Sequence, residues 1–578
     1  MADTTVPVLQ ERRTPWGLAA VLFACSAAVY VALRSGAYCG DMVWQSCVAE
    51  GLSAVRFKPD HLFYGPMVRG VYRVWQGIGL PGRAHIALQT VNGLFGGLMV
   101  ATMFLLVYRI SRRRLMAAAA AVLFGLTPYV WEHATDVETY GATKSLQLVA
   151  VYLLFSLAEG GETRRRYRLA LLLGLFHALA TWIHYGHVML VPAALVATLL
   201  PGNDVRLVTR LKVAATYLLT VGVLVWVPYI YIAFWVERLP SAGAFVKWLA
   251  SPGYGWKPGA RMDPVNTPLK ILAKSVSWAT PLSPPQHLAK RAIKGTFPLS
   301  DYVSRFWWRI GAAAVVGLVQ VALVAWFVAF FRRIWSRRRA FVIVSLLIIG
   351  FYQMFQIYWG GSFMGMAIPA YVAVLVLAFV DAREQRPGSR VAAALVAVVT
   401  LSFAVASVAG LVLRYVPEHD ESRNLHLQET LFAARQLDPV KDLMFGPGGC
   451  KVSEYWAYFA KEHRPYWLIE HAPPTDAADP TAEMLADADQ AVRHVLKHGG
   501  RVFVHRLFSE SEDDMTRPWN EFPKTYGAEK AIRREAVVAH FSRYKHEEAF
   551  RFKKWLGHSV YWRITGPPDE EAKAPGTD

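Results

Sequence analysis

The stretch RRIWSRRRAFVIVSLLIIGFYQMFQIY, residues 332–358, joins a cluster of five arginines to 19 residues without a charged side chain. About 20 predominantly apolar residues are enough to cross a bilayer as an α-helix. Basic side chains collect in the cytoplasmic loops of membrane proteins. The stretch therefore predicts a membrane-spanning helix that begins on the cytoplasmic side.

The composition of the whole chain agrees with this pattern. The 578 residues are 54% hydrophobic and 18% charged, whereas soluble domains carry about 25% charged residues. The net charge of +19 is uneven: residues 1–413 hold 39 Lys+Arg against 16 Asp+Glu, and residues 414–578 hold 23 against 27. Because the positive excess lies in the apolar part, it indicates membrane orientation rather than nucleic-acid binding.

The sequence predicts a polytopic α-helical membrane protein with a transmembrane domain at 1–413 and a C-terminal α/β domain at 414–578. Eleven spans are expected, and no cleavable signal peptide. Basic clusters at 109–114, 163–168, 206–212, 332–339 and 381–390 fall in alternate short loops, which places the N-terminus in the cytoplasm and the C-terminal domain outside. The expected spans are 16–33, 85–107, 115–131, 142–158, 169–183, 187–200, 213–235, 307–330, 340–358, 363–380 and 391–413.

The segment 169–200 is short for two full spans. A single span would place the arginines of 332–339 outside, against the distribution of basic residues. We therefore expect two short spans joined outside by HYGH, residues 184–187. His184 and His187 are then candidates to line a cavity, with hydrogen-bonded structural histidines as the alternative.

Three outer stretches, 34–84, 132–141 and 236–306, are more than connectors. The first contains GDMVWQSCVAEGL, whose apolar spacing predicts a surface helix over 42–55. Nine of the 16 acids of the membrane part lie outside on this topology, and Asp41 lies a few residues past the end of the first span. An acid near lipid costs free energy unless it forms an ion pair or has a functional role. Asp41 is therefore either functional or a partner of a loop arginine.

Three segments together resemble the GT-C superfamily of integral-membrane glycosyltransferases. GDMVWQSCVAEGL (40–52) is similar to the acid and surface helix of their first outer loop. FKPDHLFYGPM (57–67) resembles a segment later in that loop. WEHATDVETYGATKSLQL (131–148) looks like their second-loop acid-x-Tyr segment, here Glu138 to Tyr140.

The resemblance implies an inverting enzyme of the bacterial inner membrane that transfers a sugar from a polyprenyl-phosphate carrier to an acceptor hydroxyl on the outer face. Asp41 would be the general base, and the lipid phosphate would leave without a strong acid behind it. The acceptor is a lipid, a glycan or a protein. Met42 stands where the family often has a second acid, which leaves two alternatives open: a divalent metal, as in oligosaccharyltransferases, or none.

Further residues are candidates for binding substrate. Asp60 and His61 would orient a substrate, hold a metal or form a structural turn, and Glu138 would hold a sugar hydroxyl or a metal, or pair with a loop arginine. Tyr140 accompanies Glu138 in the resemblance. Lys257 and Arg261 belong to a basic loop whose cations would hold the lipid phosphate or meet anionic headgroups. No His/Cys/Asp cluster has recognised zinc spacing.

The cysteines and the C-terminal part leave alternatives open. Cys39, Cys47 and Cys450 would all lie outside, as free thiols or with one disulfide among them. Strands are expected at 442–448, 465–472 and 501–508, and helices at 453–463 and 486–500. The stretch FGPGGCKVS lacks phosphate-loop spacing, and the last residues, GPPDEEAKAPGTD, have the composition of disorder.

Two other functions compete with the glycosyltransferase. A glycan ligase or lipid-modifying transferase of similar architecture would move a preassembled glycan from a diphosphate carrier. A transporter would carry polar residues within its spans, and often internal repeats. Few ionisable residues fall within the expected spans, and the chain has no clear repeat, which disfavours the transporter.

Overall fold

The computed structural model describes residues 14–36, 38, 40–53, 57–137, 139–159, 162–200, 206–250, 298–359, 424–446, 451–463, 465–467, 479–505, 534–554 and 557–568. The chain forms two compact units. Unit 1 comprises 1–35, 55–67 and 86–418, and unit 2 comprises 36–54, 68–85 and 419–578. Two segments of the first predicted outer loop therefore fold with the C-terminal part of the chain.

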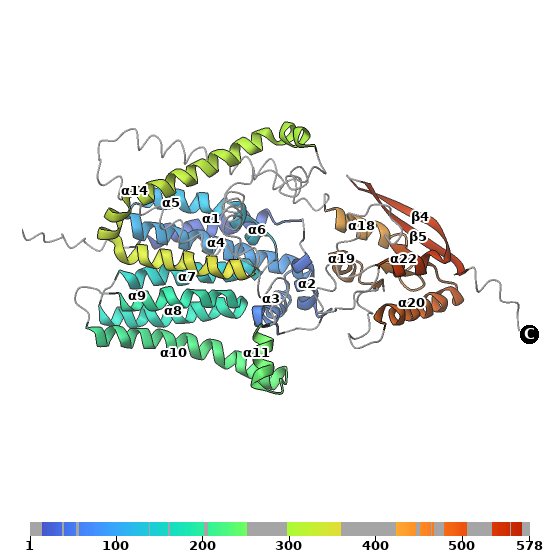
Figure 1. Ribbon diagram of the computed structural model, residues 1–578, viewed down its shortest axis with the longest axis horizontal. Helices are drawn as coiled ribbons and strands as arrows, with labels where there is room; N and C mark the ends of the chain where they lie inside the picture. The colour runs from blue at the N-terminus through green and yellow to red at the C-terminus, as the bar shows by residue number, and fades with distance from the viewer. Residues whose placement is uncertain are drawn as a thin grey trace, which may run out of the picture. The chain divides into compact units, whose positions relative to one another are not determined.

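In its described residues, unit 1 is helical throughout (Figure 1). Its α-helices are α1 (Trp16–Ala32), α4 (Ala84–Ser111), α5 (Arg114–Gly125), α6 (Pro128–Thr135), α7 (Thr139–Ala158), α8 (Thr163–Ile183), α9 (Val191–Leu199), α10 (Leu207–Tyr231), α11 (Ala242–Ala250) and α14 (Leu299–Trp359). Shorter turns are the 3-10 helices η1 (Pro59–His61) and η2 (Tyr185–Leu190), and the π-helix η3 (Ile232–Val236). Helix α3 (Tyr64–Gly77) begins in unit 1 and continues in unit 2, and the first two residues of α4 belong to unit 2.

Among the described residues, three helical segments are long and apolar enough to cross a membrane: α4, α7, and α10 with η3. Helices α1, α5 and η2 with α9 are apolar but shorter. Nine of the eleven expected spans coincide with helical segments, and those at 363–380 and 391–413 lie outside the described residues. The number of eleven spans and their orientation stay predictions.

Close packing around α4 depends on its glycines. A Cβ atom on Gly96 would lie 2.5 Å from the Cβ of Ala134 in α6, and one on Gly97 would lie 2.8 Å from the Cβ of Ala27 in α1. Helix backbones can approach this closely only where the side chain is small, which is a common device between membrane helices. The absence of side chains at these positions therefore lets α1 and α6 pack directly on α4.

Two segments, 115–131 and 332–339, differ locally from the sequence prediction. The expected span 115–131 is divided, because Thr127 accepts a hydrogen bond from the Val130 N–H and caps a new helix, α6, that has Pro128 at its first position. The expected loop 332–339 is helical, and α14 breaks only at Arg338, where φ is −132° and ψ is 32°. Figure 1 draws α14 as two arms that meet at this break.

The segment 169–200 agrees with the sequence prediction of two short segments joined at 184–187. Helix α8 begins at Thr163 and ends before His184, and the chain then continues through η2 into α9. The Arg166 guanidinium near the start of α8 donates to the Thr198 carbonyl at the end of α9, 2.9 Å away. The chain therefore turns back at 184–187, as two separate segments require.

The described part of unit 2 contains a five-stranded mixed sheet of order β2-β1-β3-β5-β4. Strand β1 is parallel to β2 and β3, and β5 is antiparallel to β3 and β4. The elements are α2 (Gly40–Glu50), α18 (Leu425–Ala434), β1 (Leu443–Gly446), α19 (Lys451–Phe459), β2 (Tyr466–Trp467), α20 (Pro480–Lys497), β3 (Val502–His505), α22 (Arg534–Ser542), β4 (Tyr544–Lys554) and β5 (Gly557–Pro568).

Helices cover both faces of this sheet because its central strands are apolar on both sides. Successive side chains of a strand point to opposite faces. Phe445 and Val504 pack in one core with residues of α20 and α22, whereas Met444 and Phe503 pack in another with residues of α18 and α19. A continuous apolar run is typical of strands that are buried on both faces.

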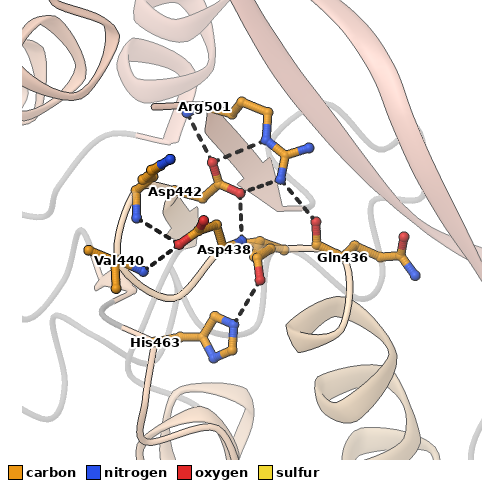
Figure 2. Close-up of polar contacts among 8 residues, drawn as sticks. Gln436, Asp438, Val440, Asp442, His463 and Arg501 are labelled. Carbon is orange, nitrogen blue, oxygen red and sulfur yellow. Dashed lines mark hydrogen bonds and ion pairs between the residues drawn. The ribbon is translucent and has the colours of Figure 1, made fainter. Parts of the chain in front are cut away.

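A polar network fixes the turn between α18 and β1 (Figure 2). The Asp442 carboxylate accepts from the backbone N–H and the Nε of Arg501, each at 3.1 Å, and from the Asp438 N–H at 2.7 Å. The Asp438 carboxylate accepts in turn from the N–H groups of Val440 and Lys441. Asp442 thereby joins the start of β1 to the start of β3.

Candidate active site

Five of the residues that the sequence marked as substrate-binding lie in unit 1 and come together: Asp60, His61, Tyr140, His184 and His187. The His61 ring meets the His184 ring edge-on, with 4.9 Å between the centroids. The centroids of Tyr140 and His187 lie 5.8 and 6.2 Å from that of His184. The tertiary structure thus unites three segments that are distant in the sequence.

The turn η1 is held against α8 and α10. Its Pro59 is at the first helical position, where a missing N–H has no cost. The Pro59 carbonyl accepts from the Tyr229 hydroxyl at 2.7 Å, and the His61 Nδ1 donates to the Ile183 carbonyl at 2.9 Å. A backbone bond from Phe63 to the carbonyl of Trp182 adds a third connection. Asp60 and His61 are therefore fixed at the end of α8.

The Asp60 carboxylate is buried and incompletely satisfied. The residue is 5% exposed, and its Oδ1 has no hydrogen-bond partner among the described residues. Its Oδ2 lies 3.7 Å from the His61 Nε2. Since Nδ1 of His61 donates to a carbonyl, a neutral imidazole presents an unprotonated Nε2 to this carboxylate. Two acceptors then face each other, an arrangement that a proton on Nε2, a hydroxyl donor or a cation would satisfy.

His187 is held from two sides. Its Nδ1 lies 2.9 Å from the Tyr352 hydroxyl, and its backbone carbonyl accepts from the His177 Nε2 at 2.7 Å. The His187 Nε2 is buried without a hydrogen-bond partner among the described residues. His184, at the end of α8, accepts at Nδ1 from the Gly186 N–H at 3.1 Å. These contacts orient both imidazoles within the cluster.

Lys144 belongs to the same cluster and was missed by the sequence analysis. It lies in α7, is 4% exposed, and its ammonium is 4.8 Å from the centroid of the Tyr140 ring. An ionisable residue inside an apolar helix is costly and usually functional. The sequence carried this signal, because Lys144 falls within the expected span 142–158. His133 of α6 was also missed; it is buried, with its ring 5.4 Å from that of Tyr140.

The other predicted site residues are not placed in this cluster. Asp41 lies in the first turn of α2, in unit 2, and its side chain is outside the description. Glu138, Lys257 and Arg261 lie outside the described residues. Cys47 is buried, but Cys39 and Cys450 are not described. The roles of these residues, a disulfide and a cleft shared by Asp41 and Glu138 therefore stay predictions.

Metal binding also stays open. Within the described part of the chain, no three His, Cys, Asp or Glu side chains converge in a way that would hold a metal ion. The Asp60–His61 pair supplies only two protein ligands, and metal sites commonly use three or more. The described residues therefore do not include a set of metal ligands.

The helix that carries Asp41 ends at a tightly bonded carboxylate. Glu50 accepts from Nε and Nη2 of Arg83, at 3.2 and 3.1 Å, from the Ala84 N–H at 3.1 Å, and from the Tyr458 hydroxyl at 2.9 Å. The Arg83 guanidinium also lies 3.8 Å above the centroid of the Tyr458 ring. All four residues belong to unit 2, and they fix the C-terminal end of α2.

We expect the end of α2 to loosen at acidic pH. Burial raises the pKa of the Glu50 carboxyl, but hydrogen bonds from Arg83, Ala84 and Tyr458 outweigh burial and hold the pKa below its ordinary value. Such a group stabilises the folded state above its unfolded pKa of about 4.3, and this contribution is lost as the pH falls through the folded pKa. Amide exchange in α2, corrected for intrinsic rates, should rise between about pH 7 and pH 3, and Glu50→Gln should remove most of that rise. Equal protection at both pH values would contradict the expectation.

Comparisons with known proteins give structural neighbours only. No family model and no curated protein matches the sequence. The chain is similar to ArnT from Cupriavidus metallidurans bound to undecaprenyl phosphate, at 13% identity and a TM-score of 0.49 over 96% of this chain and 98% of that chain. It is also similar to the apo state of ArnT, at 12% identity and a TM-score of 0.49 over 95% of this chain and 98% of that chain. A third similar structure is the Archaeoglobus fulgidus oligosaccharyltransferase in complex with Zn and sulfate, at 12% identity and a TM-score of 0.44 over 93% of this chain and 72% of that chain.

Proposed function

We propose that the chain is a membrane-embedded inverting glycosyltransferase of the GT-C type. It transfers a sugar from a polyprenyl-phosphate carrier to an acceptor hydroxyl on the outer face of the membrane. One observation carries the proposal: Asp60, His61, Tyr140, His184 and His187, marked by sequence as substrate-binding, form one cluster with Lys144 in a unit of apolar helices. All of them are buried except His61 and Tyr140, which are partly exposed. Buried polar groups without partners are costly unless a ligand satisfies them.

The proposed reaction uses Asp41 as general base. The acceptor oxygen attacks the anomeric carbon from the face opposite the phosphate, while Asp41 takes the hydroxyl proton. The bond between the anomeric carbon and the phosphate oxygen breaks, and polyprenyl phosphate leaves with the electron pair. Cations stabilise the charge that develops on this phosphate. Lys257 and Arg261 are proposed for this role, and the ammonium of Lys144 is a further candidate.

The Asp60–His61 pair is proposed to bind a hydroxyl of the transferred sugar. The Asp60 Oδ1 lacks a partner among the described residues, and the His61 Nε2 is an acceptor when neutral. Each of two sugar hydroxyls supplies one donor, one for Asp60 Oδ1 and one for His61 Nε2. The partly exposed ring of Tyr140 is proposed to pack on CH groups of the sugar.

Transfer can be measured directly. The full chain in nanodiscs would be incubated with a panel of polyprenyl-phosphate monosaccharides and source membranes as acceptor, and released polyprenyl phosphate would be quantified by mass spectrometry. We expect release with at least one donor. Release only from a diphosphate-linked glycan would instead support the ligase. No release from either class would overturn the proposed function.

We expect Asp60→Asn to lower kcat/KM for the donor by about tenfold to a hundredfold. A hydrogen bond to a charged group is worth about 1.5–3 kcal/mol, and asparagine retains the size of the side chain without its charge. Glu159→Gln is the matched control: it also removes a carboxylate from unit 1, but Glu159 pairs with Arg109 and Arg112. Equal kinetics for both variants would remove Asp60 from the site.

The proposed arrangement places the N-terminus in the cytoplasm and residues 414–578 outside, as an α/β domain beside the inner membrane. This arrangement is inferred from the basic clusters in alternate loops, because basic residues collect on the cytoplasmic side. A reporter that is active only after export should be active when it is fused after Asp578, and inactive when it is fused within 206–212. The reverse pattern would place the C-terminal domain in the cytoplasm and overturn the eleven-span topology.

A further inference from the structure

The segment that carries Asp41 is bonded at both ends to one helix of the C-terminal part of the chain. Helix α2 packs against α19 within unit 2. Tyr455 and Tyr458 lie three residues apart in α19, so their side chains share one face of the helix. Tyr455 is 1% exposed and Tyr458 is fully buried. One tyrosine contacts the residues before α2, and the other contacts its last residue.

The N-terminal connection consists of three linked hydrogen bonds. The Tyr455 hydroxyl donates to the Tyr38 carbonyl and accepts from Asn424 Nδ2 at 3.0 Å. Asn424 Nδ2 also donates to the Gly36 carbonyl at 2.9 Å. The Asn424 Oδ1 accepts from the Leu427 N–H at 3.1 Å and thereby caps α18. Both polar atoms of the Asn424 side chain are used, so the carbonyls of residues 36 and 38 are held with little freedom.

Ring contacts reinforce this connection. The Tyr38 ring stacks on that of Phe459, with 5.4 Å between the centroids, and meets His85 edge-on at 5.3 Å. Aromatic pairs in these geometries stabilise the contact beyond the burial of area. Tyr38 lies three residues before Asp41 and is 5% exposed. Its position therefore constrains the start of α2.

The C-terminal connection is the Glu50 network. The Tyr458 hydroxyl donates to Glu50, accepts from the His85 backbone N–H at 3.3 Å, and lies 3.0 Å from the His85 Nδ1. Between the two connections, Met42, Val43, Cys47 and Val48 of α2 are buried. Helix α2 is therefore fixed in position along its axis and in rotation about it.

We propose that α18 and α19 position Asp41 for the reaction, with Asn424, Tyr455 and Tyr458 as the positioning residues. This inference rests on the proposed function, in which Asp41 is the base, and it gives the C-terminal part of the chain a role in turnover. A general base must stay within about 3 Å of the proton that it removes. A misplacement of about 1 Å can lower the rate by about a hundredfold.

The test compares single hydroxyl deletions in the full chain in nanodiscs. Tyr455→Phe and Tyr458→Phe remove one connection each and retain the rings. Tyr466→Phe is the matched control, because its hydroxyl also bonds a carboxylate in unit 2, that of Asp487, away from α2. Amide exchange of residues 36–50 is measured by mass spectrometry, with β1 and β3 as the internal reference for folding.

We expect exchange of 36–50 to rise by about tenfold in Tyr455→Phe and Tyr458→Phe, and to stay unchanged in Tyr466→Phe. The value of kcat per folded molecule, measured with the donor panel described above, should fall by about tenfold or more while the donor KM stays the same. Unchanged exchange in 36–50, or an unchanged kcat despite faster exchange, would overturn the proposal. A loss of protection in β1 and β3 as well would mean a purely structural role and would also overturn it.

The test distinguishes a failure of the positioning role from a failure of the proposed function. If Asp41→Asn abolishes transfer but both tyrosine variants turn over normally, only the positioning role fails. If Asp41→Asn turns over normally, the assignment of the base fails, whatever the exchange data show.

Discussion

Asp41→Asn is expected to lower the rate of sugar transfer by about two orders of magnitude or more. Asparagine has nearly the size of aspartate and retains hydrogen bonding, but it cannot accept a proton from the acceptor hydroxyl near neutral pH. The backbone of Asp41 lies in the first turn of α2, which is held by Tyr38 and Glu50 at its two ends. Folding should therefore survive the change, and the loss should appear in kcat.

Binding of polyprenyl phosphate provides the control for this variant. The lipid carries no transferable sugar, so its affinity should be the same for Asp41→Asn and the unmodified chain. Transfer and lipid binding are measured on the same preparation in nanodiscs. Near-normal turnover of Asp41→Asn would remove Asp41 as the base. The Asp60–His61 pair, in which the Asp60 Oδ2 lies 3.7 Å from the His61 Nε2, would then be the next candidate.

Asp442→Ala is expected to destabilise unit 2 by about 2–4 kcal/mol. The Asp442 side chain is 2% exposed and accepts from Arg501 and from the Asp438 N–H (Figure 2). Alanine leaves these donors without an acceptor at the junction of β1 and β3. The guanidinium of Arg501 is 46% exposed, so water can solvate it, which keeps the cost below that of a fully buried charge.

Amide exchange in β1 and β3 measures this loss. Glu548→Ala is the matched control, because it breaks the exposed ion pair between Glu548 and Arg551. Exposed pairs contribute about 0–1 kcal/mol. Protection should fall strongly in Asp442→Ala and little in Glu548→Ala. Equal protection in the two variants would show that the Asp442 network does not support the sheet.

The helical architecture of unit 1 follows from local sequence. Runs without charge, such as 340–358, have few ways to satisfy their backbone in lipid except as helices. The boundary missed at Thr127 was also encoded locally, by a capping threonine followed by proline. The hairpin of β4 and β5 was not anticipated, because β4, YKHEEAFRFKK, is rich in charged residues and lacks the alternation that marks a half-buried strand.

The sequence by itself determined which residues are unusual: an acid after the first span, an Asp-His pair between prolines, two histidines in a short turn, and a lysine within an apolar run. Only the tertiary structure decided which of them meet. His61 and His184 are separated by more than a hundred residues, and their contact depends on the hydrogen bond from His61 to Ile183. Likewise, α2 is a plain helix in the sequence, and its partner α19 lies in the C-terminal part of the chain. Local pattern fixes the conformation of a segment, whereas the choice between distant partners depends on packing and hydrogen bonds that form only in the folded chain.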